Sequence, residues 1–161
     1  MTAAVTIFRF KMGKVLQVSR KPYQIVVDTN VLLAGLRSQR GASYKLLTML
    51  NDSRWQVNVS TTLIFEYEEV LKREREQLGL SIKDIDNLLD GICNIANKRS
   101  IFYLWRPAAR DADDDFLIDL AVESQADFII TFNQRDLQEA KKFGIKVVKP
   151  KQFLKTVGEI K

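Results

Sequence analysis

The chain has 161 residues, 46% of them hydrophobic, which suits one compact domain with a real core. It contains no histidine, which excludes Ser-His-Asp and Cys-His acyl transfer, histidine-based ribonuclease chemistry and His-ligated zinc sites. The net charge of +5 suits a polyanionic partner, because lysine and arginine that neutralise phosphates release condensed counterions. If the protein is an enzyme, its carboxylates carry the chemistry.

Residues 1–22 are expected to be an N-terminal extension, either a hairpin or a disordered segment, before a domain that covers residues 23–161. No stretch approaches the ~18 consecutive apolar residues of a membrane span, and the first twenty residues lack a signal-peptide pattern. The single cysteine, Cys93, is predicted to be a small core side chain. We therefore expect a cytoplasmic protein without a membrane segment.

Apolar runs of β-type composition alternate along the chain with segments of helical spacing. The predicted strands cover residues 24–28, 54–60, 100–105, 127–131 and 145–149. The first predicted helix begins at Asn30, and the others cover residues 42–52, 61–77, 82–97, 114–124, 134–142 and 151–156. Ser81 is the predicted cap of the helix over 82–97, and Gly144 is the predicted stop after the helix over 134–142. Strands separated by helices pair in parallel through right-handed crossovers. The expected fold is a three-layer α/β/α domain with a central, mostly parallel five-stranded sheet.

The first predicted strand ends on an acid, Asp28, in the segment "QIVVDTN". Its apolar residues suit a parallel strand that is covered on both faces. In open α/β sheets ligands bind beyond the carboxyl ends of the strands, so Asp28 is placed for chemistry. The alternative is that Asp28 or Thr29 only caps the helix that begins at Asn30. Other acids must converge on the same edge to decide between these two interpretations.

Glu66 is the candidate acid on the helix predicted over residues 61–77. Glu69 points away from the apolar stripe of this helix, and Glu68 has Lys72 four residues later for an ordinary surface pair. Glu66 has no such cation and flanks the stripe, so it is favoured as a site residue. The stripe itself consists of Leu63, Ile64, Tyr67, Val70 and Leu71.

Two further candidates, Asp114 and Asp136, come from later points in the chain. Asp114 has apolar residues three, four and seven positions on and is expected to face the buried side, whereas Asp111, Asp113 and Asp115 are expected in solvent or in support of the site. Asp136 is equally consistent with a simple helix N-terminal charge. Clustered carboxylates raise one another's pKa unless a cation lies between them, and oxygen ligands select Mg²⁺ or Mn²⁺ over zinc.

Two other phosphoryl-transfer classes also place an acid after a first strand. A haloacid-dehalogenase-type phosphatase needs a second acid two residues later, where this chain has Asn30. A response-regulator receiver needs an adjacent acid pair before its phosphorylated aspartate, and none precedes Asp28. Neither class fits the sequence.

Four segments carry a family resemblance: "VVDTNVLLAGL", "VSTTLIFEYEEVL", "RDADDDFLIDLAVESQADFIITFNQRDL" and "FGIKVVKPKQFLKT". Together they resemble the PIN-domain family, specifically the bacterial toxin subgroup related to VapC-like ribonucleases. The resemblance runs in order over residues 23–157, and "TFNQRDL" has the family's Thr-x-Asn-x-x-Asp spacing.

The resemblance implies a site that binds one or two divalent ions, Mg²⁺ or Mn²⁺, for phosphodiester cleavage. It implies that Asp28, Glu66 and Asp114 are the core acids and Asp136 the fourth. The supporting polar positions would be Thr29, Asn30, Ser60 and Asn133. Asn133 stands where some relatives have Asp, and the missing negative charge weakens the binding of a second ion.

The activity implied by the resemblance is that of a metal-dependent endoribonuclease, the toxin component of a toxin–antitoxin pair. Its expected partners are RNA, a cognate antitoxin protein and a second copy of the chain in a homodimer. Single-stranded or looped RNA is the expected substrate because its bases are accessible to a shallow cleft. Arg110 and Arg135 are candidate contacts to the RNA backbone, although each also fits a solvated surface position. The alternative function is a non-catalytic PIN-like module that binds RNA or protein.

Overall fold

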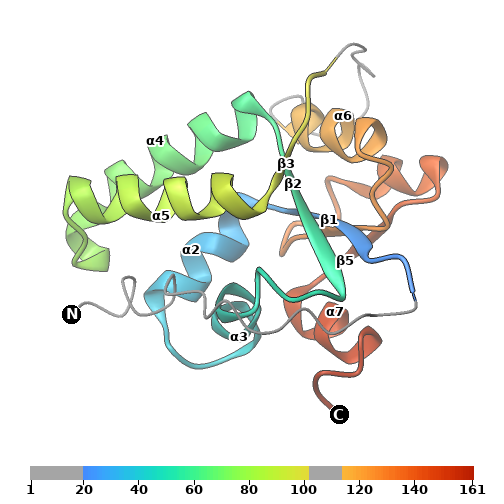
Figure 1. Cartoon of the computed structure of the whole chain (residues 1–161), viewed down its shortest axis with the longest axis horizontal. Coiled ribbons are helices and arrows are strands. Elements are labelled where there is room, and N and C mark those ends of the chain that lie inside the picture. Colours follow the sequence, from blue (N-terminus) through green and yellow to red (C-terminus); the bar gives the residue numbers. More distant parts are fainter. Residues whose placement is uncertain (1–19, 102–113) are drawn as a thin grey trace.

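The computed structural model, drawn in Figure 1, describes residues 20–101 and 114–161, and the described strands form one five-stranded sheet. The strand order is β3-β2-β1-β4-β5, and every pairing is parallel. The strands are β1 (Tyr23–Val27), β2 (Trp55–Val59), β3 (Asn97–Lys98), β4 (Phe128–Ile130) and β5 (Lys146–Val148). With helices flanking this sheet, the expected three-layer α/β/α fold is confirmed.

Six α-helices and one 3₁₀ helix are described. α4 lies beside α5 in Figure 1 and also packs against α2, while α3 packs between α2 and α7. α6 packs against β1 and the 3₁₀ helix η2. The helices are α2 (Thr29–Arg37), α3 (Ala42–Thr48), α4 (Thr61–Leu78), α5 (Ile82–Ile95), α6 (Asp115–Glu123) and α7 (Pro150–Thr156), with η2 at Gln138–Phe143.

β1 lies at the centre of the sheet, and its apolar run is buried as predicted. Ile25, Val26 and Val27 are all buried, and they lie in one core with Leu63 of α4 and Leu117 of α6. Cys93 is half-buried on α5 rather than a core residue. No described helix combines the length and the apolar character that crossing a membrane requires.

The third strand differs from its prediction. We expected residues 100–105, but β3 is the two-residue segment Asn97–Lys98, which pairs with Asn58 and Val59; residues 102–105 lie outside the described part of the chain. Both residues of β3 are polar and exposed. A polar edge strand shows no apolar alternation, so the hydrophobic pattern could not mark it.

The helix predicted over residues 134–142 is also different. The chain turns from Gln134 to Leu137, and a 3₁₀ helix follows from Gln138 to Phe143. Leu137 and Ala140 are fully buried at a spacing of three residues, which is the period of a 3₁₀ helix. The stop at Gly144 is confirmed, because this residue adopts a φ of 78° before β5.

The cap predicted for α5 is confirmed as a capping box. Ser81 Oγ accepts a hydrogen bond of 3.0 Å from the Asp84 backbone N–H, and the Asp84 carboxylate accepts one of 2.9 Å from the Ser81 backbone N–H. Both bonds satisfy backbone donors that have no partner inside the helix. They fix the point at which the chain leaves α4 and enters α5.

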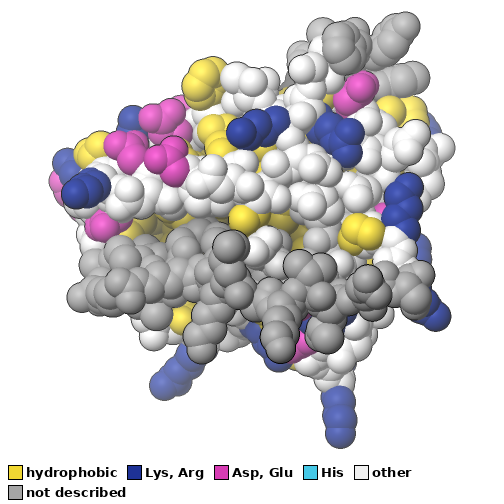
Figure 2. Space-filling view, in the orientation of Figure 1, with side chains coloured by type: hydrophobic (Ala, Val, Ile, Leu, Met, Phe, Trp, Pro, Cys, Tyr) yellow, Lys and Arg dark blue, Asp and Glu magenta, His cyan; other side chains and the backbone are white. Residues whose placement is uncertain are grey.

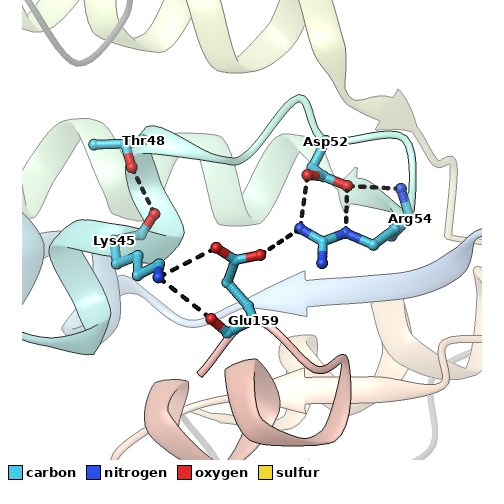
Figure 3. Close-up of polar contacts among 5 residues, drawn as sticks. All are labelled: Lys45, Thr48, Asp52, Arg54 and Glu159. Carbon is cyan, nitrogen blue, oxygen red and sulfur yellow. Dashed lines mark hydrogen bonds and ion pairs between the residues drawn. The ribbon is translucent and has the colours of Figure 1, made fainter. Parts of the chain in front are cut away.

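An ion-pair network fastens the C-terminal segment to the start of β2 (Figure 3). The Arg54 guanidinium donates to both carboxylate oxygens of Asp52, at 2.8 and 2.9 Å, and to Glu159 at 2.8 Å. Lys45 of α3 lies 3.2 Å from the other carboxylate oxygen of Glu159. Hydrogen bonds from Arg54 lower the pKa of Asp52 below its usual value. Hydrogen bonds from Arg54 and Lys45 lower the pKa of Glu159 in the same way.

Arg54→Met is expected to lower the free energy of unfolding by about 1 kcal/mol at pH 7, since the network is only partly exposed and multiply bonded. An acid whose pKa is lowered by folding stabilises the folded state at every pH above its unfolded pKa. This stabilisation is lost as the pH falls through the pKa of the folded state. The difference between the two proteins should therefore shrink by pH 3 in urea denaturation. Arg37→Met, which removes a more exposed pair with Glu74, serves as the control with a smaller effect. A difference that is equal at pH 7 and pH 3 would contradict the electrostatic explanation.

Candidate functional site

Asp28 follows β1 directly and is 7% exposed. It occupies the N-cap position of α2, yet its side chain makes no capping hydrogen bond. One carboxylate oxygen instead accepts a hydrogen bond of 2.7 Å from the hydroxyl of Thr131, which follows β4. The backbone N–H of Asp28 donates to the Ile130 carbonyl oxygen at 2.9 Å. The carboxylate is therefore tied to the end of the neighbouring strand rather than used as a helix cap.

The Thr131 hydroxyl connects several of the expected residues. It is fully buried, and besides donating to Asp28 it accepts hydrogen bonds from the Asn133 backbone N–H at 2.8 Å and from Asn30 Nδ2 at 3.4 Å. The side-chain amide of Asn133 donates to a carboxylate oxygen of Asp114 at 3.2 Å. A chain of hydrogen bonds thus runs from Asp28 to Asp114, through residues that follow β4.

Glu66 reaches the same edge of the sheet from α4. The Thr29 hydroxyl donates a hydrogen bond to the Glu66 carboxylate. The next residue, Tyr67, is buried, and its hydroxyl donates to the carbonyl oxygen of Val27, the last residue of β1. These two bonds hold the second turn of α4 against the end of β1, which places Glu66 beside Asp28.

Burial raises the pKa values of the two central acids, Asp28 and Glu66. For Asp28 burial raises the pKa, and the hydrogen bond from Thr131 offsets part of that effect. For Glu66 burial again raises the pKa, the hydrogen bond from Thr29 lowers it, and the negative charge of Asp28 raises it further. Neither acid has an ion pair within the described residues. A cation bound between them would favour the ionised form of both.

The described side chains do not by themselves form a complete metal site. Across residues 20–101 and 114–161, no three Asp, Glu, Cys or His side chains are grouped closely enough to hold an ion. The donor chemistry does fit Mg²⁺ or Mn²⁺, because the candidate ligands are all oxygen atoms. The residues that would hold such an ion are Asp28 and Glu66, and Asp114 is connected to Asp28 through Asn133 and Thr131.

The remaining sequence candidates lie in different settings. Asp136 is half-buried in the turn before η2, and the described contacts do not connect it with Asp28 or Glu66. Ser60 is buried and caps α4, accepting a hydrogen bond of 3.2 Å from the Leu63 backbone N–H. Arg135 is exposed. Arg110, Asp111 and Asp113 lie outside the described residues.

Asp115 and Asp119 are acids whose environment the sequence did not reveal. We expected Asp115 in solvent or in support of the site, but it is 2% exposed, and Asp119, one turn later on α6, is equally buried. A solvent position is therefore wrong for Asp115. The four-residue spacing places both acids on one helix face, and this spacing was the available signal.

Two further residues that shape the site, Thr131 and Tyr67, were not singled out as site residues. Thr131 ends the strand segment "DFIIT" just as Asp28 ends "QIVVD", so its topological position was a usable signal. Tyr67 was assigned to the apolar stripe of α4, which its burial confirms. Hydrophobic periodicity, however, gives no indication of where a hydroxyl at the end of a buried ring will donate.

Two of the cavities lined by described residues lie near opposite ends of the strands, and Arg99 contributes to both linings. One of about 270 Å³ lies at the carboxyl ends of β2 and β3, the edge that carries the acids, and includes Ser60 and Phe65 in its lining. The other, of about 520 Å³, lies at the amino ends of β1 and β4, where Gln24 and Asp127 line it. The larger cavity contains none of the candidate acids, so the carboxyl edge remains the candidate functional site.

Comparison with known protein families identifies the family of the chain. A family model described as a PIN domain matches residues 24–135, which is more than half of the chain. PIN domains are generally nucleases, which bind nucleic acids and usually hold divalent metal ions. No curated protein matches the chain at a significant level. On the family match and the parallel five-stranded sheet together, this chain belongs to the PIN-domain family.

Proposed function

We propose that the protein is a metal-dependent endoribonuclease that hydrolyses RNA phosphodiester bonds. The observation that carries this proposal is the convergence of acids at one place: the buried Asp28 carboxylate lies beside Glu66 and is connected through Thr131 and Asn133 to Asp114. Charged acids held together in this way are prepared for a cation. Their position beyond the carboxyl ends of the strands is where open α/β sheets bind ligands.

The proposed ligands of the ion are Asp28, Glu66 and Asp114, with Asp136 as the fourth acid. One or two Mg²⁺ or Mn²⁺ ions, when bound, would neutralise charge on the phosphate oxygens and make the attacking water more acidic. Thr131 orients the Asp28 carboxylate, Thr29 orients that of Glu66, and the Asn133 amide orients that of Asp114. Asn30 supports the same network by bonding to Thr131 and to the backbone N–H of Phe132. Ser60 supports it by fixing the start of α4.

Single-stranded or looped RNA is the proposed substrate. The net charge of +5 favours a polyanion. In Figure 2 acidic and basic side chains lie together at the outer end of α4 and α5, and further basic side chains lie toward β3 and α6. Arg135, which is exposed, and Arg110 are proposed contacts to the RNA backbone.

The biological role proposed from the family resemblance is that of a toxin, related to VapC-like ribonucleases, with an antitoxin protein and a second copy of the chain as partners. If this role is right, induced expression should arrest growth, and the Asp28→Asn protein should not. Growth arrest by both proteins would contradict a toxicity that depends on RNA cleavage.

A second candidate function is a PIN-like module that binds RNA or protein without cutting. It is favoured by the absence of a three-acid group among the described side chains. The two functions differ in their response to metal, because a pure binder need not be stabilised by a divalent ion.

The test is incubation of single-stranded RNA with the protein in Mg²⁺, in Mn²⁺ and in EDTA, together with thermal unfolding in the same buffers. We expect cleavage only with metal and a raised Tm, since an ion at one hundred times its Kd stabilises the folded state by about 2.7 kcal/mol. Intact RNA in every buffer, with an unchanged Tm, would favour the non-catalytic module instead.

A further inference from the structure

The cavity of about 270 Å³ beside the acids has an apolar side and a basic side. Val59, Ile64 and Phe65 form the apolar side, and Lys98 and Arg99 form the basic side. Its described lining contains no acid. At about 30 Å³ for each water, the volume corresponds to roughly nine water molecules, which is room for one flat ring system rather than for an element of a protein partner.

Phe65 presents an aromatic ring to this cavity. It is 63% exposed, although it lies in the second turn of a helix whose neighbouring residues Leu63 and Tyr67 are buried. Thr61, Ile64 and Phe65 are spaced so that they share one face of α4, and all three line the cavity. An exposed ring beside an apolar wall offers a surface on which a nucleobase can stack.

Lys98 and Arg99 supply positive charge at the same place. The Arg99 side chain is positioned by a hydrogen bond of 3.0 Å from Nε to Asn58, and its backbone N–H donates to Val59 at 2.8 Å. Within the described part of the chain neither residue forms an ion pair. Arg99 also lines the larger cavity, together with Glu123 and Asp127, so Lys98 is the basic residue that belongs to this cavity alone.

The cavity and the acids lie along one continuous edge. Asp28 follows β1 and Ser60, which lines the cavity, follows the adjacent strand β2; on α4, Glu66 is the residue next to Phe65. On the side of Asp28 away from the cavity, Phe132 follows β4 and is 45% exposed. β3 and β4 are separated by three interstrand spacings, which is roughly 14 Å. A strand of nucleic acid covers this distance with roughly four nucleotides, at about 3.4 Å for each stacked nucleotide.

We infer that the cavity receives a base of the RNA strand next to the scissile phosphate, with Phe65 stacked on the base and Lys98 on the adjoining phosphate. The choice of RNA rests on the proposed function. The strand would cross the acids at β1 and β4 and reach the cavity at β2 and β3. Phe65 is thus a positioning residue for substrate, separate from the acids.

The test is the affinity of the full chain for a short labelled single-stranded RNA, measured by fluorescence anisotropy in EDTA. We expect Phe65→Ala to weaken binding about tenfold, because stacking of one base on an aromatic ring is worth roughly that much. Phe65→Trp should retain the affinity. Phe143→Ala, which truncates a 40%-exposed ring just before β5, is the matched control and should bind as wild type. Lys98→Ala should reduce the slope of log affinity against log salt by about 1.

Each result decides the inference. Loss of affinity in Phe65→Ala alone, with its Tm unchanged and with rescue by Phe65→Trp, supports it. RNA affinity that is unchanged in Phe65→Ala overturns it, and so does the absence of RNA binding by wild type. If Phe65→Ala alters only self-association in sedimentation, the cavity is a protein contact and the inference is wrong. RNA that binds through Phe65 but is never cut in Mn²⁺ would contradict the proposed nuclease while supporting this base site.

Discussion

Asp28→Asn is expected to slow RNA cleavage about a hundredfold or more and, in EDTA, to raise the Tm of the protein. The loss of activity follows because the neutral amide cannot supply the negative charge that the proposed ion requires, and a bound ion stabilises charge in the transition state by several kcal/mol, roughly a hundredfold or more in rate. The gain in stability follows from the raised pKa of Asp28. The amide oxygen can still accept the hydrogen bond from Thr131.

The pH dependence of this gain has a definite sign. Because the folded pKa of Asp28 lies above its unfolded value, folding favours the protonated carboxyl, and that stabilisation is lost as the pH rises through the folded value. Asparagine resembles the protonated form at every pH. The stability difference between the two proteins should therefore be present at pH 7 and disappear under acid, as measured by urea denaturation in EDTA.

Asp86→Asn provides the control for Asp28→Asn. Asp86 is exposed on α5, and its replacement changes the net charge by the same amount without touching the site. It should leave both cleavage and Tm unchanged. An Asp28→Asn protein that is folded and cleaves RNA at the wild-type rate would contradict the assignment of Asp28.

Thr131→Val is expected to lower the free energy of unfolding by about 2 kcal/mol and to slow cleavage by ten- to a hundredfold. Valine has nearly the same shape as threonine but removes the hydroxyl that bonds to Asp28 and to the Asn133 backbone N–H. Buried polar groups that lose their partners cost about 1–3 kcal/mol. Groups that orient the ligands of a metal are typically worth ten- to a hundredfold in affinity or activity.

Thr131→Ser is the matched control, because it keeps the hydroxyl and loses only a methyl group. It should retain most of the wild-type activity, with a modest loss of stability. Activity that falls equally in the valine and serine variants would show that packing, rather than the hydroxyl, is what matters at this position.

The sequence predicted best where burial decides the structure. The run Ile25-Val26-Val27 indicated a strand covered on both faces, and β1 is the central strand of the sheet. β3 was not predicted because Asn97 and Lys98 are polar, and their pairing with β2 depends on contacts distant in sequence. The helix expected at residues 134–142 became a turn and a 3₁₀ helix, which apolar spacing over a few residues does not separate from an α-helix.

The site was predictable only in part, because convergence depends on strand order. With β1 between β2 and β4, the residues that follow these three strands must meet, and this condition brings Asp28 beside Thr131. Side-chain hydrogen bonds have no counterpart in hydrophobic periodicity, so the link from Thr29 to Glu66 could not be derived in advance. For the same reason Ser60 could be recognised as a polar site position but not as the cap of α4.

The most direct measurement is the anomalous density of a crystal of the protein soaked in Mn²⁺. We predict a peak within bonding distance, about 2.0–2.2 Å, of a carboxylate oxygen of Asp28 and of a second oxygen from Glu66 or Asp114. A crystal whose manganese peaks all lie away from Asp28 would contradict the proposed metal site and the nuclease mechanism built on it.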